Sequence, residues 1–300
     1  MCVCAAARVR DQFSTRHGVR GVTSLDDKLF VLLKLNDNPD KYQVAVYSMD
    51  DYRDLSCPLD VPGTIKDMTS CVRNKCLYMS DWDNSCIHRY QLDSGTLSAK
   101  IKHVEVSGTS KWSLPEPDSP HPLGLSVIPN SGNLLVICQK PNVLVELSAE
   151  SGKIVHKIQL GLQPQIEWPH DGVQLTNGQI VVCYGCDRDP EHRSRHGVCV
   201  LGKVDERDNV TTICEVEGGF DQKHLKWPRH FAVAEDSQSQ FTGLFVADES
   251  NNTVVLLSPT LEFVRNVIEG LSKPCRVYFH TASQRLFVGQ LDGGVIIVQL

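Results

Sequence analysis

A pair of short apolar runs separated by turn residues occurs six times along the chain, and this repeat constrains the fold more than any other feature. In the best example, the run Leu244–Ala247 is followed by the polar segment Asp248–Asn252 and the run Thr253–Leu257. Two such runs joined by turn residues predict a β-hairpin. The first runs of the six pairs begin at Leu29, Cys76, Leu134, Ile180, Leu244 and Leu286.

The spacing of the pairs predicts a radial repeat architecture. Successive first runs begin 47, 58, 46, 64 and 42 residues apart. A third apolar segment, often opened by proline, precedes each pair, as in PRHFAVA from Pro228. A period of about 40–50 residues with several short strands per repeat is typical of a β-propeller. We therefore expect an all-β fold, a six-bladed β-propeller, with residues 1–300 as a single domain.

The last repeat is expected to borrow a strand from the other end of the chain. The expected blades span about 18–57, 64–107, 121–162, 168–218, 227–270 and 273–300. The last of these has room for only three strands, and an uncovered sheet edge invites pairing with other chains. Residues 2–13 are therefore expected to supply the fourth strand and close the ring.

Composition excludes several classes of function. The net charge of −6 and the pI of about 6.0 create no global field that would attract nucleic acid or a membrane. No apolar run approaches the length of about 18 residues that a membrane span needs. The first residues, MCVCAAARVRDQFST, lack the pattern of a secretory signal. We therefore expect a cytoplasmic protein whose twelve cysteines are reduced thiols.

The repeat unit resembles the NHL repeat, which forms six-bladed propellers. The match is best from WPRHFAVA through GLFVADESNNTVVLLS, with Asp248 and Asn251 at the family's Asp and Asn positions. Asp81 and Asn84 occupy these positions in CLYMSDWDNSCIHRYQL. NHL propellers often end tripartite-motif ubiquitin ligases, but the chain contains nothing like a RING, B-box or coiled coil. The resemblance implies a recognition function, or the recognition arm of a ligase whose catalytic part is on another chain.

A ring of residues near the start of the innermost strands is the first candidate binding site. Alignment of the six inner segments places at the mouth of the central channel Arg20, Lys66, Gly124, Asp171, His230 and Arg276. Three of these are cationic in an otherwise acidic chain, which favours an anionic partner. The alternative is that Asp171 pairs with a neighbouring arginine and the ring is solvated structure.

The tryptophans are expected on the same face as this ring, together with the loop 187–196. They are Trp82, Trp112, Trp168 and Trp227. Trp112 lies in the Pro/Ser-rich segment 107–120 and is the best candidate for an exposed anchor. Trp168 and Trp227 precede proline in equivalent positions, so the alternative for them is that they seal gaps between blades. Exposed aromatic residues beside cations suit a protein partner or single-stranded RNA.

Two groups of residues are candidate metal ligands. The first comprises residues with zinc-ligand types and spacing, although their middle spacing is short: Cys183, Cys186, His192 and His196. The second comprises His121, His170 and His230 at the blade starts, since peptidyl-amidoglycolate lyases are propellers with a catalytic zinc near the channel. These three histidines fall at different register positions, which argues against a common metal centre. A calcium-dependent lactonase propeller needs converging carboxylates. The aligned ring offers a single acid, which argues against this class.

These patterns favour a non-enzymatic recognition scaffold without a cofactor, acting as a monomer. A protein or peptide partner is preferred over RNA because the net charge is negative and the basic positions are few. The alternatives are a zinc-dependent lyase that uses His170 and His230, and the ligase arm. No Ser-His-Asp elbow, P-loop or dinucleotide fingerprint is present.

Overall fold

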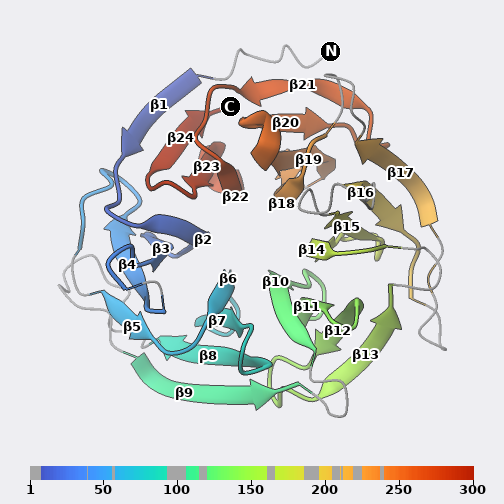
Figure 1. The fold of residues 1–300 in the computed structure, drawn as a ribbon, viewed down its shortest axis with the longest axis horizontal. Coiled ribbons are helices and arrows are strands. Elements are labelled where there is room, and N and C mark those ends of the chain that lie inside the picture. Colours follow the sequence, from blue (N-terminus) through green and yellow to red (C-terminus); the bar gives the residue numbers. More distant parts are fainter. Residues whose placement is uncertain are drawn as a thin grey trace.

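The chain forms a ring of six four-stranded antiparallel sheets, shown in Figure 1. This architecture is a six-bladed β-propeller, as the repeat predicts. In this computed structural model the described residues are 8–38, 40–55, 58–92, 106–114, 120–160, 166–185, 196–204, 210, 212–218, 225–236 and 240–300. Within them, the helices are two single turns, η1 (Glu249–Asn251) and η2 (Thr281–Ser283).

In the first five blades the strands run in chain order from the centre to the rim, and in the last blade β1 takes the rim position. The innermost strands are β2 (Gly18–Leu25), β6 (Ile65–Cys71), β10 (His121–Val127), β14 (Pro169–Gln174), β18 (Pro228–Glu235) and β22 (Pro274–His280). The second strands are β3 (Lys28–Lys34), β7 (Cys76–Asp81), β11 (Leu134–Gln139), β15 (Ile180–Tyr184), β19 (Phe241–Asp248) and β23 (Arg285–Gln290). The third strands are β4 (Tyr42–Ser48), β8 (Cys86–Leu92), β12 (Val143–Leu147), β16 (His196–Leu201), β20 (Thr253–Leu257) and β24 (Val295–Gln299). The rim strands are β5 (Leu59–Val61), β9 (Val106–Ser113), β13 (Ile154–Gln159), β17 (Thr212–Gly218), β21 (Phe263–Ile268) and β1 (Arg8–Phe13).

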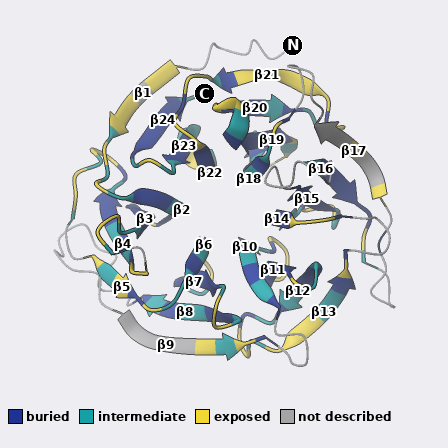
Figure 2. Ribbon diagram, viewed as in Figure 1, coloured by how far each residue is buried: buried dark blue, intermediate teal, exposed yellow. Residues whose placement is uncertain are grey.

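The hydrophobic core lies between neighbouring blades. The described residues form six apolar clusters, and each joins the facing sheets of two adjacent blades. The second strands are buried on both faces, which is why they read as continuous apolar runs such as LLVIC from Leu134 in β11. Exposure increases toward the rim, as Figure 2 shows for β13 and β21. Burial of apolar surface between blades therefore holds the ring together.

Both ends of the described chain meet in the last blade. β1 pairs antiparallel with β24, from Arg8 with Gln299 to Phe13 with Val295, with a register shift between Val9 and Asp11, and lies on the outside of that blade in Figure 1. The ring of Phe13 lies 4.5 Å from that of Tyr47 in blade one. The expected closure by the N-terminal strand is confirmed for residues 8–13, whereas residues 2–7 lie outside the described residues.

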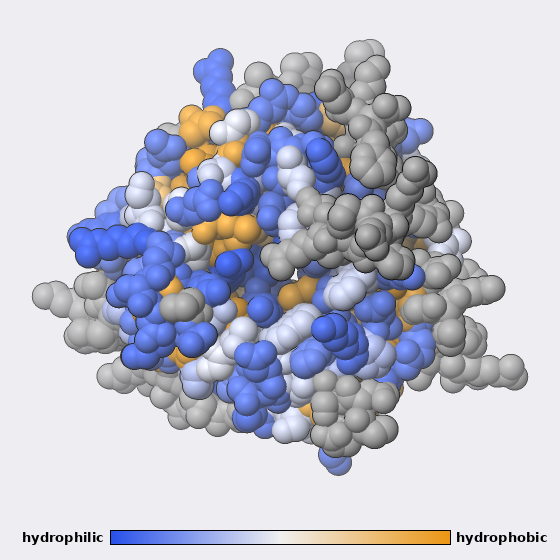
Figure 3. Space-filling view, viewed as in Figure 1, coloured by the Kyte–Doolittle hydropathy of each residue, from blue (hydrophilic) through white to orange (hydrophobic). Residues whose placement is uncertain are grey.

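Within the part of the chain that the structure describes, no helix has the length and apolar character needed to cross a membrane. The face seen in Figure 3 is mostly hydrophilic where it is described, with small apolar patches. Cys71 and Cys76 are register partners across the hairpin of β6 and β7, and their thiols are free.

Candidate functional site

A β-bulge near the start of every inner strand decides which residue faces the channel. In β6, Ile65 pairs with Asp81 and Asp67 with Ser80, so Lys66 is the extra residue. The same shift occurs in the other five inner strands. A bulge re-aims the side chains that follow it. The residues that directly follow the bulges, and so share one level of the channel, are Gly21, Asp67, Gly124, Asp171, His230 and Arg276.

This level differs from the expected ring in two blades. Gly21 and Asp67 take the places expected for Arg20 and Lys66, which lie one residue closer to the start of their strands. The hairpin turns differ in length between blades, so counting back from the apolar run misses the register by one. Gly21 leaves no room for a side chain, because a Cβ there would lie 2.9 Å from the Cβ of Met68.

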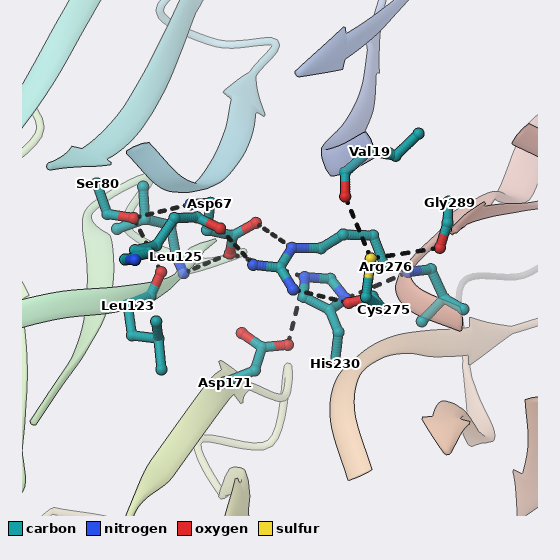
Figure 4. A network of polar contacts seen from close by, with 12 residues as sticks. Val19, Asp67, Ser80, Leu123, Leu125, Asp171, His230, Cys275, Arg276 and Gly289 are labelled. Carbon is teal, nitrogen blue, oxygen red and sulfur yellow. Dashed lines mark hydrogen bonds and ion pairs between the residues drawn. The ribbon is translucent and has the colours of Figure 1, made fainter. Parts of the chain in front are cut away.

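Asp67 and Arg276 form a buried ion pair that crosses the channel (Figure 4). Nε of Arg276 donates to Oδ1 of Asp67 at 3.0 Å, and the two side chains are only 8% and 1% exposed. The other carboxylate oxygen accepts the backbone N–H of Leu125 at 2.9 Å. The remaining guanidinium nitrogens donate to the carbonyls of Cys275 and Lys66. The expected cationic side chain is therefore neutralised inside the channel.

His230 and Asp171 lie beside this ion pair, and we call the four side chains together the plug. Nε2 of His230 lies 3.5 Å from Oδ2 of Asp171 and 3.7 Å from Oδ2 of Asp67. Nδ1 of His230 accepts the N–H of Val277 at 3.5 Å, and Asp171 accepts that of Phe231 at 3.2 Å. Each of these side chains thus ties one inner strand to the next. The alternative weighed from the sequence, acid–arginine pairing, occurs here, although the acid that pairs is Asp67.

The two buried acids differ in how easily they lose a proton. Burial raises the pKa of Asp171 to about 6, although His230 acts in the opposite direction. Burial acts on Asp67 too, but Arg276 and His230 outweigh it and lower the pKa of Asp67. The charge of Asp67 is therefore the one that the fold is built to hold.

Below the plug, a cavity of about 320 Å³ extends toward the hairpins that join the first and second strands. Its walls carry hydroxyl groups of Ser24, Ser70 and Ser126, and Asp171 and His230 lie at its inner end. The inner strands begin at the opposite face of the ring. We call that opposite side the mouth face.

Three of the bulge residues are cations on the mouth face, namely Arg20, Lys66 and Arg229. Nζ of Lys66 lies 5.3 Å from the ring centroid of Trp82, and this ring stacks on His121 at 4.8 Å. Burial and the nearby charge of Arg20 lower the pKa of Lys66, and Lys34 and Arg229 act in the same direction, whereas the charge of Asp83 acts in the opposite direction. Arg229 has a counter-ion, since its Nε lies 3.0 Å from Oε2 of Glu249. Among the described residues, no carboxylate forms an ion pair with Arg20 or Lys66.

The other tryptophans are placed differently from one another. Trp112 lies on β9, opposite Ile87, and packs against Tyr78 at 5.7 Å and against Gly152. This corrects the expected exposed loop, since the strand lets the ring fill the gap to blade three. Trp227 lies under the guanidinium of Arg229 at 4.8 Å. Trp168 is 40% exposed. Residues 187–195 of the expected binding loop lie outside the described residues.

The Asp and Asn positions of the repeat have a structural role. Asp248 accepts the backbone N–H of Lys226 at 2.7 Å and the side-chain amide of Asn251 at 2.7 Å. Asp81 does the same with Thr64 and Asn84. Each carboxylate thus ties the segment that leads into its blade to the hairpin of strands two and three. In blade six, Gln290 accepts the N–H of Ser272 at 2.7 Å and replaces the acid.

Replacing Asp248 with asparagine should change how stability depends on pH. Burial raises the pKa of Asp248 to about 6, from 3.8 when unperturbed. As the pH rises above about 4, the unfolded carboxyl ionises first, so wild-type stability falls until about pH 6 by about 3 kcal/mol. Asp248→Asn lacks this loss. Urea unfolding should show its stability relative to wild type improving by about that amount from about pH 4 to about pH 7. A relative stability that is the same at both pH values, or an equal change in Asp50→Asn at an exposed site, would contradict the assignment.

The structure describes only part of the two candidate metal sites. Cys183 is buried in β15 and His196 begins β16, whereas Cys186 and His192 lie outside the described residues. His121 and His170 contact the carbonyls of Trp82 and Gly185. In the described part of the chain, two groups bring three ligand atoms within 4.8 Å of one another. Asp67, Asp171 and His230 form one group, and Asp81, Cys86 and His88 form the other. Sequence reasoning missed both, although Cys86-x-His88 follows Asp81 closely in the chain.

Comparison with known proteins supports the fold alone. The chain matches no protein-family model and no curated protein sequence. Among solved structures, a functionally unknown protein from Desulfotomaculum acetoxidans has a TM-score of 0.59 at 12% identity, covering 84% of this chain and 72% of its own. A Lactobacillus plantarum protein has a TM-score of 0.58 at 13% identity, covering 90% and 76%. Kuenenia stuttgartiensis hydrazine synthase has a TM-score of 0.59 at 12% identity, covering 96% and 97%.

Proposed function

We propose that this propeller is a non-enzymatic recognition scaffold that binds an acidic peptide segment at the mouth face. The observation that carries the proposal is the placement of Arg20 and Lys66. Both are partly buried cations without an ion-pair partner among the described residues, and Lys66 lies beside Trp82. Partly desolvated cations that repel one another are stabilised by an incoming anion.

The plug supports this placement because its own cation is already paired. The charge of Arg276 is already balanced by Asp67, so it adds little to the field outside. An acidic side chain from a partner would meet Arg20 and Lys66 at the mouth face, with Trp82 as an aromatic contact. Arginine and tryptophan are the residue types that dominate binding energies at interfaces.

A protein partner fits these groups better than RNA. The whole chain carries a net charge of −6, which opposes a long polyanion, whereas a short acidic segment needs only a local cationic site. We also infer that the blades are NHL-type repeats, since Asp81 with Asn84 and Asp248 with Asn251 make the same contacts in two blades. Association with a ubiquitin ligase stays a prediction that depends on this resemblance.

Charge reversal at the mouth face tests the proposal. The double variant Arg20→Glu, Lys66→Glu is expected to weaken binding of a labelled glutamate-rich peptide at least about tenfold, or about 1.4 kcal/mol, while leaving the circular dichroism spectrum unchanged. Fluorescence anisotropy with wild type should also show weaker binding of the matched glutamine peptide and of oligouridylate. Arg276 is not used, because reversing a buried, paired charge would disrupt the fold.

The control variant Arg8→Glu, Lys153→Glu has the same net charge change at two exposed positions. It should bind the peptide almost as wild type does. Equal losses of affinity in the control and in Arg20→Glu, Lys66→Glu would show that only the net charge matters. Tighter binding of oligouridylate than of the peptide would replace the peptide proposal with RNA.

A further inference from the structure

Asp81, Cys86 and His88 meet beneath the hairpin that joins β7 and β8. Cys86 is the cross-strand partner of Asp81, and His88 lies two residues further along β8, on the same face of the sheet. Nε2 of His88 lies 2.9 Å from Oδ2 of Asp81. Sγ of Cys86 lies 3.8 Å from that nitrogen and 3.9 Å from that oxygen.

We propose that these three side chains bind a zinc ion, with water as the fourth ligand. Zinc prefers exactly these ligand types, with distances of about 2.3 Å to sulfur and about 2.0–2.1 Å to nitrogen or oxygen. Tetrahedral geometry at those distances separates neighbouring ligand atoms by about 3.3–3.6 Å. In the observed triangle the nitrogen–oxygen side of 2.9 Å is shorter than this range and the two sides to sulfur, 3.8 and 3.9 Å, are longer. To seat the ion, the side chains would have to rotate so that His88 and Asp81 move apart and Cys86 moves closer.

The charges of the three ligands suit a buried divalent cation. Binding displaces the proton of the Cys86 thiol to solvent and leaves a thiolate. The thiolate and the Asp81 carboxylate together balance the two positive charges, while His88 binds as the neutral imidazole. A neutral complex avoids the cost of burying net charge. The side chain of Asp81 is 1% exposed and that of His88 is 13% exposed, so His88 marks the side from which an ion would enter.

Neighbouring groups hold the carboxylate in place. The backbone N–H groups of Thr64 and Asn84 donate to Oδ1 of Asp81 at 3.2 and 3.3 Å, and the side-chain amide of Asn84 donates to Oδ2 at 2.8 Å. Such outer contacts orient metal ligands and reduce the entropy that binding would cost.

Blade five provides an internal comparison. Asp248 and Asn251 make the same turn contacts there, but Thr253 and Val255 occupy the positions of Cys86 and His88. Thr253 donates to the carbonyl of Ile268 instead of facing the acid. The turn is therefore built without a thiol or an imidazole, so the structural role of Asp81 does not account for either side chain in blade two.

The second ligand cluster is less suited to a metal. The guanidinium of Arg276 lies against it, with Nε 3.0 Å from Oδ1 of Asp67. A cation placed at Asp67, Asp171 and His230 would lie beside the positive guanidinium and be repelled by it.

Cobalt titration of the whole chain tests the proposal. The protein is purified under reducing conditions, stripped of metal with a chelator and titrated with Co²⁺. We expect one equivalent of Co²⁺ to give a thiolate charge-transfer band and tetrahedral d–d bands, which Zn²⁺ then abolishes. Cys86→Ser should remove the thiolate band, and His88→Gln should weaken Co²⁺ binding at least about tenfold.

Cys138→Ser is the matched control, because Cys138 is equally buried but belongs to neither ligand cluster. It should keep the full cobalt spectrum. Absence of a thiolate band in wild type, or an unchanged band in Cys86→Ser, would overturn the proposal, the second result by assigning the metal to other cysteines. If Cys86→Ser fails to fold, His88→Gln decides: unchanged Co²⁺ affinity in that variant would leave only the hydrogen bond between His88 and Asp81.

Discussion

Asp67→Asn is expected to lower the free energy of unfolding by about 3–5 kcal/mol, the range for breaking one partner of a buried ion pair. The amide keeps an acceptor for the N–H of Leu125 but removes the charge that faces Arg276. The guanidinium would then be buried without a counter-ion at the centre of the ring. Urea unfolding monitored by circular dichroism measures the loss.

Asp171→Asn is the matched control at the same level of the channel. The pKa of Asp171 is raised to about 6 by burial, so the fold disfavours the charge that this substitution removes. The expected loss is only that of weakened hydrogen bonds, about 0.5–1.5 kcal/mol. A loss as large as that of Asp67→Asn would show that the network as a whole, and not the ion pair, provides the stability.

A double-mutant cycle separates the pair from its surroundings. Arg276→Met alone leaves Asp67 uncompensated, whereas Asp67→Asn with Arg276→Met removes both charges. The double variant should therefore be less destabilised than the sum of the two single variants, by more than about 1 kcal/mol. Additive losses would contradict direct coupling between the two side chains.

The repeat alone predicts the ring because its signal is redundant. Each blade requires its own apolar runs, and six copies with turn residues between them leave few alternatives. The closure was predictable for the same reason, since the last blade lacked one strand. The sequence pattern of Asp81 and Asp248 also indicated equivalent positions, and their contacts to Asn84 and Asn251 agree.

The residues that line the channel were harder to predict, because a register error of one residue replaces an acid with a cation. The segment Ile65–Met68 contains both Lys66 and Asp67, and only the bulge decides which one faces Arg276. Bulges leave no composition signal in a strand of this length. In the same way, Cys86 and His88 converge on Asp81 through a cross-strand register, whereas spacing rules search for ligands along the chain.

Deleting residues 1–13 is expected to abolish the soluble monomer. This truncation removes β1 and exposes the edge of β24, whose residues Val295–Val298 are almost fully buried. That segment is rich in β-branched residues and uncharged, which is the composition that favours edge-to-edge association. The ring of Phe13 would also be lost from its contact with Tyr47, so blades six and one would separate more easily.

Size-exclusion chromatography with light scattering measures the outcome, and deletion of residues 1–7 alone is the control. The shorter deletion leaves β1 (Arg8–Phe13) and its register with β24 intact, so it should elute as wild type does. Phe13→Ala, which keeps the ladder, should remain monomeric with a loss of about 3–5 kcal/mol at most. A monomeric protein of wild-type stability after removal of residues 1–13 would show that blade interfaces suffice without the shared sheet. Aggregation of that variant alone would show that the strand from the N-terminal end is what keeps the ring closed.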